Sequence, residues 1–116
     1  MGRLSTHVLD TSRGKPGAGM RYTLYRLDGE ARVKLAEGTT TADGRAEKPL
    51  LEGAEFRAGR YQLVYQVAAY FRALGVALAD PPFLDEVTLA FGLGEDGHYH
   101  VPLLVAPYGY TTYRGS

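Results

Sequence analysis

Apolar and polar residues alternate along several short segments of the chain, and turn-forming residues separate these segments. In LSTHVLD, residues 4–10, the even-numbered side chains are expected on one face of a strand and Ser5, His7 and Leu9 on the other. β-Branched and aromatic residues are frequent in the same segments, as is typical of strands. Further strands are expected at Met20–Leu27, Ala31–Thr40, Arg60–Gln66, Leu84–Leu93, His98–Ala106 and in the tail from Tyr108.

One segment departs from this alternation and predicts a helix. VAAYFRALG, Val67–Gly75, is rich in alanine and leucine and ends in glycine, a common residue at the C-terminal cap of a helix. Pro81 and Pro82 prevent any continuation and mark the entry to the next strand. About seven or eight strands and one short helix together predict an all-β fold, a two-sheet antiparallel sandwich.

Composition narrows the class of partner. A chain of 116 residues fits one domain, residues 1–116. Thirteen basic residues balance thirteen acidic ones, so neither a nucleic acid nor an anionic membrane is an expected partner. The absence of cysteine excludes disulfides, thiolate metal sites and cysteine nucleophiles. Because residues 1–10 lack the apolar stretch of a signal peptide and no segment is long enough to span a bilayer, a cytoplasmic location is expected.

Two of the three histidines lie two residues apart, in HYH, so His98 and His100 are expected on one face of a strand. Such a pair can bind a metal, but no third ligand stands at a diagnostic spacing, and a solvated or packing pair is the favoured alternative. Histidine is also the side chain best suited to move protons near neutral pH, because its unperturbed pKa is about 6.5.

The other candidate site residues can also be explained by a purely structural role. His7 is either a surface or hydrogen-bonded core histidine or a functional one, and Arg45, which follows an Asp-Gly turn, is either solvated or a ligand clamp. Residues 113–116, YRGS, are either edge residues or part of a site. The chain has no glycine-rich phosphate loop, no nucleophile elbow and no HExxH motif, so nothing supports phosphoryl transfer, acyl-enzyme chemistry or zinc proteolysis.

Four stretches taken together resemble one family: HVLDTSRGKPG, TTADGR, GRYQLVYQVAAYFRALG and HYHVPLLVAPYGYTTYRGS. The chain resembles, from about Leu4 to Ser116, the 5-hydroxyisourate hydrolases, transthyretin-related enzymes of urate breakdown. The most specific element is the terminal YRGS, which closes the enzymes of this family, whereas transthyretin hormone carriers lack it and the early histidine. The differences from the commoner PLLLSPYGYSTYRGS, at Val105, Ala106 and Thr111, are small or conservative.

The resemblance implies a transthyretin-like hydrolase domain that uses no cofactor and no metal. It implies hydrolysis of a cyclic amide in 5-hydroxyisourate, which gives 2-oxo-4-hydroxy-4-carboxy-5-ureidoimidazoline. The implied catalytic residues are His7, Arg45, His100 and Ser116. The implied substrate-binding residues are His7, Arg45, Tyr113, Arg114, Gly115 and Ser116, and His98 is a supporting residue.

These residue types suit the implied reaction. Histidines supply proton transfer, and Arg45 supplies a permanent cation with a planar set of donors. Because no cysteine or elbow serine is available as a nucleophile, direct attack by activated water is expected. The resemblance also implies a homotetramer, a dimer of dimers, and a functional link to urate oxidase and a ureidoimidazoline decarboxylase. The alternatives are a non-catalytic transthyretin-like small-ligand carrier and, with less support, an adhesion or carbohydrate-binding sandwich.

Overall fold

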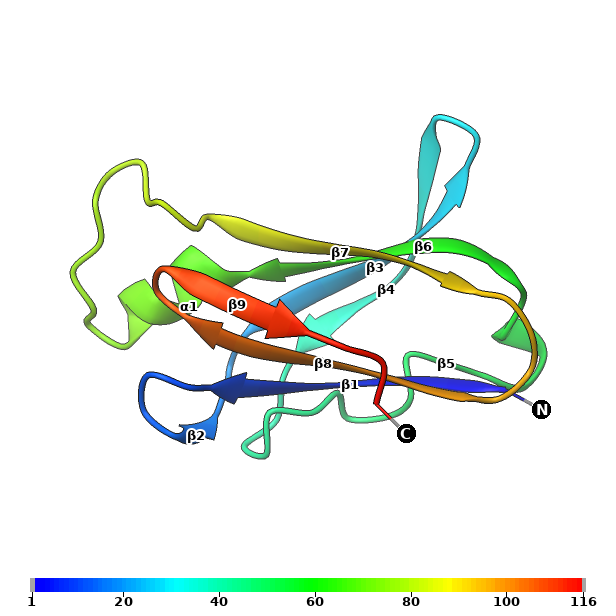
Figure 1. The fold of residues 1–116 in the computed structure, drawn as a ribbon, viewed down its shortest axis with the longest axis horizontal. Helices are drawn as coiled ribbons and strands as arrows, with labels where there is room; N and C mark the ends of the chain where they lie inside the picture. The colour runs from blue at the N-terminus through cyan, green and yellow to red at the C-terminus, as the bar shows by residue number, and fades with distance from the viewer. Residues whose placement is uncertain (1, 116) are drawn as a thin grey trace.

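Two β-sheets lie face to face in the computed structural model, which describes residues 2–115 (Figure 1). The first sheet contains β1 (Arg3–Asp10), β2 (Lys15–Pro16), β5 (Leu51–Glu52), β8 (His98–Ala106) and β9 (Gly109–Thr112). The second contains β4 (Ala31–Thr39), β3 (Arg21–Asp28), β6 (Gly59–Gln66) and β7 (Glu86–Leu93). A 3₁₀ turn, η1 (Gly53–Glu55), precedes β6, and the helix α1 (Val67–Ala73) follows it.

The predicted two-sheet sandwich with one short α-helix is confirmed, and each predicted strand is present with ends shifted by a few residues. The sequence did not indicate β2 and β5, because two residues are too few to show an alternation. That the whole of residues 1–116 forms a single domain stays a prediction.

One strand pair corrects the expectation of a wholly antiparallel sandwich. β1 and β8 run parallel over eight residue pairs, from Arg3↔His98 to Asp10↔Val105. A parallel pair needs a long connection between its strands, and here most of the chain forms that connection. The register places Ser5 beside His100, so both side chains project from the same face of the sheet.

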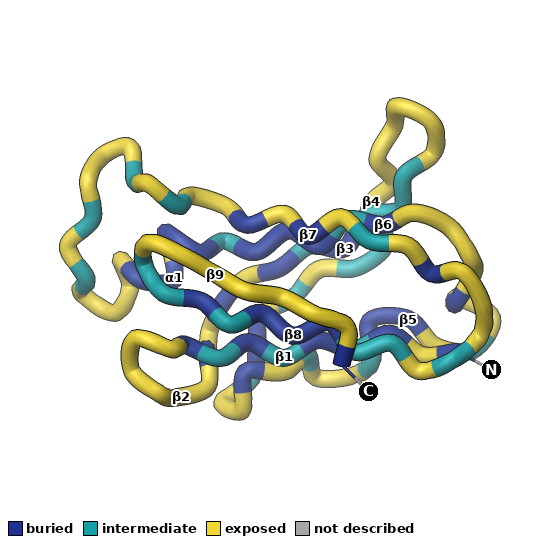
Figure 2. The backbone as a smooth tube through the Cα atoms, in the orientation of Figure 1, coloured by how far each residue is buried: buried dark blue, intermediate teal, exposed yellow. Residues whose placement is uncertain are grey.

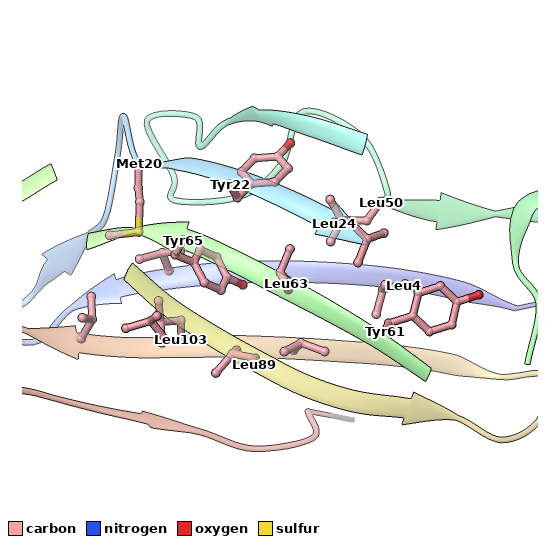
Figure 3. Close-up of a cluster of buried hydrophobic side chains, with 14 of the residues drawn as sticks. Leu4, Met20, Tyr22, Leu24, Leu50, Tyr61, Leu63, Tyr65, Leu89 and Leu103 are labelled. Atoms are coloured by element: carbon pink, nitrogen blue, oxygen red, sulfur yellow. The ribbon is translucent and has the colours of Figure 1, made fainter. Parts of the chain in front are cut away.

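Alternation along the strands builds the core between the sheets. In β1, Leu4, Thr6 and Val8 are buried and the side chains between them are half-buried, whereas residues 63–65 of β6 are buried without a break (Figure 2). Figure 3 shows buried leucines of both sheets packed with buried tyrosines of the second sheet. Thr6 joins the sheets, because its hydroxyl donates to the carbonyl of Val101 (2.7 Å) and is hydrogen-bonded to the Tyr65 hydroxyl.

The predicted glycine cap of the helix is confirmed. Gly75 adopts a φ of +84°, a left-handed conformation that favours glycine. Its N–H donates to the carbonyl of Arg72 (2.9 Å), and the N–H of Val76 donates to the carbonyl of Phe71 (3.0 Å). This pair of bonds is the Schellman arrangement that ends helices.

The end of β1 is fastened to α1 by a buried carboxylate. Asp10 is fully buried and accepts hydrogen bonds from the Ser12 hydroxyl (2.5 Å), Arg13 Nε (3.0 Å) and the Tyr70 hydroxyl (2.8 Å). Burial raises the pKa of Asp10, but these hydrogen bonds outweigh it and hold the pKa below its ordinary value. The carboxylate is therefore charged and fully partnered at neutral pH.

Across residues 2–115, no helix has the length and apolar character needed to cross a membrane. The cytoplasmic location stays a prediction.

Candidate active site

Three of the predicted site residues, from three distant segments, meet at the outer face of the first sheet. His7 comes from β1 and His100 from β8, and their ring centroids lie 6.4 Å apart with the ring planes inclined by 36°. Arg45 forms an isolated antiparallel bridge with His7 on the edge of β1 away from β8. The structure therefore places two imidazoles and a guanidinium-bearing residue together.

A tight turn docks Arg45 onto β1. The N–H of Gly44 donates to the carbonyl of Thr41 (2.8 Å), and the carbonyl of Gly44 accepts from the N–H of Val8 (2.7 Å). Gly44 has a φ of +76°, and a Cβ added there would lie 2.3 Å from the carbonyl oxygen of Val8. Only glycine fits both conditions, so the Asp-Gly turn fixes the course of the chain just before Arg45. The loop that contains this turn runs below β1 in Figure 1.

The His100 imidazole is held by a neighbour on β1. Ser5 Oγ lies 2.8 Å from His100 Nδ1, as the parallel register allows. Partial burial, the positive charge of Arg45 and the proximity of His7 together lower the pKa of His100 below its ordinary value. His100 is therefore largely neutral at neutral pH and able to accept a proton.

The tail of the chain returns across β8 to this site, as Figure 1 shows. Gly115 bridges to His100, and its N–H donates to the His100 carbonyl (2.6 Å). A Cβ on Gly115 would lie 2.8 Å from His100 Cδ2, so the absence of a side chain lets the tail pack against the ring. Ser116, a predicted catalytic residue, lies outside the described residues, and its role stays a prediction.

Two predicted substrate-binding residues of the tail point elsewhere. The Arg114 guanidinium lies 4.1 Å from the centre of the Tyr99 ring, and Tyr99 projects from the opposite face of β8 to His100. Tyr113 and Arg114 line a hollow of about 440 Å³ between β7 and β9, together with Tyr99. Their substrate-binding role stays a prediction, and this single chain does not bring their side chains to the two histidines.

His98, the predicted supporting residue, is exposed and pairs in register with Arg3 near the start of β8. Among residues 2–115, no three side chains of histidine, cysteine, aspartate or glutamate gather in a way that could hold a metal ion.

Ser5 is the site residue that the sequence did not indicate. Its contact with His100 joins residues 95 apart in the chain, and the parallel pairing of β1 with β8 creates it. Only knowledge of that register would have pointed to Ser5.

Known proteins share this arrangement of strands and much of the sequence. Residues 4–115 match the HIUase/Transthyretin family. A Mesorhizobium japonicum protein named 5-hydroxyisourate hydrolase is 59% identical over 115 residues, which cover 99% of this chain and 93% of that protein.

Two solved structures extend the likeness. The structure of Klebsiella pneumoniae 5-hydroxyisourate hydrolase is 40% identical, with a TM-score of 0.82 over 100% of both chains. Sea bream transthyretin in complex with thyroxine is 25% identical, with a TM-score of 0.87 over 97% of this chain and 94% of that one. The predicted resemblance and the transthyretin-like fold are thus confirmed, and the chain belongs to the HIUase/Transthyretin family.

Proposed function

We propose that this protein hydrolyses 5-hydroxyisourate and opens its six-membered ring to give 2-oxo-4-hydroxy-4-carboxy-5-ureidoimidazoline. The observation that carries the proposal is the meeting of His7, Arg45 and His100 on one face of the first sheet. Relatives named 5-hydroxyisourate hydrolase support the choice of substrate, since one is 59% identical over almost the whole chain.

The reaction consumes one water. As the water oxygen forms a bond to the ring carbonyl carbon, the water gives a proton to a base; the C–N bond of the cyclic amide then breaks, and the leaving nitrogen takes a proton from an acid. The products of that cleavage are a carboxylate and an N–H group. We assign His100 as the base, because partial burial and the neighbouring Arg45 lower its pKa and favour its neutral form, and we assign His7 as the acid.

Arg45 contributes charge and geometry. Negative charge grows on the carbonyl oxygen during attack, and a guanidinium that is always protonated stabilises it with directed donors. The chain has no cysteine to form a covalent intermediate, so the proposal is direct attack by water.

We infer that the working unit is a homotetramer, a dimer of dimers. β9 is exposed along its whole length and, like β7, lies at the edge of its sheet (Figure 2). Phe83 and Tyr108 are 75% and 70% exposed, and their rings contact each other at 6.2 Å between centroids. Unpaired edges and exposed aromatic residues both favour burial against further copies of the chain. A sedimentation measurement that finds a fully active monomer would exclude the tetramer.

The alternative is a carrier that binds a small aromatic ligand without chemistry, and the likeness to thyroxine-bound transthyretin is what favours it. The experiment that separates the two uses 5-hydroxyisourate made in the cuvette from urate by urate oxidase. Its decay is followed by ultraviolet absorbance with and without this protein.

We expect decay to accelerate in proportion to protein concentration, and the acceleration to be lost in His100→Gln. A folded wild-type protein that leaves the decay at its spontaneous rate would overturn the hydrolase proposal. Small-ligand binding would then be the activity to measure.

A further inference from the structure

Ser5 and His100 form a pair that the parallel strands align. They are direct partners in the register of β1 and β8, and both side chains lie on the outer face, away from the core. The distance of 2.8 Å between Ser5 Oγ and His100 Nδ1 is that of a good hydrogen bond. Ser5 is half-buried, so the contact is partly shielded from water.

Other contacts restrain the same imidazole. Gly115 packs against the Cδ2 edge of the ring and fixes the His100 backbone through a hydrogen bond of 2.6 Å. The hydrogen bonds among residues 2–115 engage the imidazole at Nδ1, and none of them reaches Nε2. Nε2 is therefore the ring nitrogen left for a water molecule or a substrate.

We propose that Ser5 is a positioning residue whose hydroxyl accepts a hydrogen bond from Nδ1–H of His100, so that Nε2 presents the lone pair that takes the proton of the attacking water. This inference rests on the proposed hydrolase function. It assigns the reacting atom and the tautomer of the base, and it gives a role to a residue outside the set of charged and histidine side chains.

The direction of the hydrogen bond follows from the chemistry of a base. A neutral imidazole has one N–H donor and one lone pair, so a lone pair at Nε2 requires the proton at Nδ1. Ser5 then accepts from Nδ1–H both before and after Nε2 gains a proton, and the hydrogen bond survives the transfer. If Ser5 donated instead, Nε2 would carry the proton and could not serve as the base.

The first test reads the tautomer without any substrate. Nitrogen-15 NMR of the His100 ring distinguishes a protonated Nδ1 from a protonated Nε2. We expect neutral His100 to carry its proton at Nδ1 in the wild type and in Ser5→Thr, which keeps the hydroxyl. In Ser5→Ala we expect the proton to move to Nε2, the site that a free histidine in water prefers. A wild-type imidazole protonated at Nε2 overturns the proposal.

The second test measures the hydrolysis of fresh 5-hydroxyisourate. General-base assistance is worth about a hundred- to ten-thousandfold, so losing the orientation of the base in Ser5→Ala should lower kcat by roughly ten- to a hundredfold, with little change in KM. Ser5→Thr should recover most of the rate. The matched control is Thr23→Ala, which removes a half-buried hydroxyl from β3 in the other sheet and should leave kcat unchanged.

A Ser5→Ala enzyme with normal kcat overturns the positioning role. A Ser5→Thr enzyme as inactive as Ser5→Ala also overturns it, since a hydroxyl that only positions the ring is replaceable. If the wild type does not hydrolyse the substrate but NMR shows the Nδ1 proton and its loss in Ser5→Ala, the proposed function fails while the Ser5–His100 hydrogen bond stands.

Discussion

β1 carries two polar clusters of opposite character. At its end, on the core side, Asp10 is fully buried and each of its neighbours donates to it, so its hydrogen-bonding capacity is used within the protein. Three residues earlier, on the outer face, His7 lies near His100, whose Nε2 receives no hydrogen bond from residues 2–115. One cluster is closed and the other is open.

This difference indicates what each cluster does. A closed buried network stabilises the native state and is costly to break, because a lost partner leaves a buried group unsatisfied. In an open cluster of titratable groups, some polar atoms have no hydrogen-bond partner within the protein and remain available to a ligand. Variants of the closed cluster should therefore change stability, and variants of the open cluster should change activity.

The largest effect is expected at Arg45. Arg45→Ala should lower kcat/KM by about a hundred- to a thousandfold, as the loss of an oxyanion-stabilising donor does in other enzymes. Its side chain is exposed, so the free energy of unfolding should change by less than about 0.5 kcal/mol. Arg60→Ala, an exposed arginine of β6, is the control and should alter neither quantity. Activity of Arg45→Ala near the wild-type level would remove Arg45 from the mechanism.

The opposite outcome is expected for Asp10→Asn. The amide NH2 of the asparagine would replace the carboxylate oxygen that accepts hydrogen bonds from Arg13 and Tyr70. The free energy of unfolding in urea should therefore fall by about 2 to 3 kcal/mol. The kcat of the folded fraction should stay near that of the wild type. Asp28→Asn, at the exposed end of β3, should be as stable as the wild type. An unchanged urea midpoint in Asp10→Asn would contradict the closed-network account.

Acid should reveal the same network in the wild type. A carboxylate with a lowered folded pKa contributes stability that is complete above its unfolded pKa, about 3.9, and is lost as the pH falls through the folded pKa. Urea titrations between pH 2 and pH 6 span the unfolded pKa of aspartate, about 3.9. Over this range the free energy of unfolding should fall more steeply for the wild type than for Asp10→Asn. Parallel curves for the two proteins would exclude this contribution of Asp10.

A smaller effect on activity is expected from Gly115→Ala. The added Cβ would lie 2.8 Å from His100 Cδ2, so the ring or the tail must shift, and kcat should fall by roughly tenfold, a part of the general-base contribution. Gly109→Ala is the matched control, because a Cβ there meets nothing within 4 Å. Equal rates for the two variants would show that the tail does not restrain the imidazole.

The smallest expected effect is a shift in the pH at which His100 titrates. Partial burial and the charge of Arg45 lower the pKa of His100, so Arg45→Gln should raise that pKa toward its ordinary value. The NMR titration of His100, and the acid limb of the residual kcat/KM, should both move to higher pH. A titration that coincides with that of the wild type would show that Arg45 does not act on His100.

The sequence predicted the elements better than their assembly. Alternation located β1, β6 and β8, and Gly75 located the end of the helix, because these signals are local. The parallel pairing of β1 with β8 was not predicted, since nothing near either strand specifies a partner some 95 residues away. The contact between Ser5 and His100 depends on that pairing and was missed with it.

The candidate site was predicted through the resemblance rather than through spacing. His7, Arg45 and His100 have no sequence spacing that brings them together; a tight turn on β1 and a parallel register do so. The tail was predicted as one unit, but it divides at the site: Gly115 packs on His100, and Arg114 stacks on Tyr99 on the other face of β8.

The most direct test of the central claim, that His7 and His100 act as one catalytic unit, is a double-mutant cycle on kcat/KM for 5-hydroxyisourate. The proteins are the wild type, His7→Gln, His100→Gln and the double variant. Residues that act as a unit give losses that do not add. We expect kcat/KM to fall by at least about a hundredfold in each single variant, and the double variant to be as active as the less active of the two single variants. Losses that multiply in the double variant, or a single variant with wild-type kcat/KM, would contradict it.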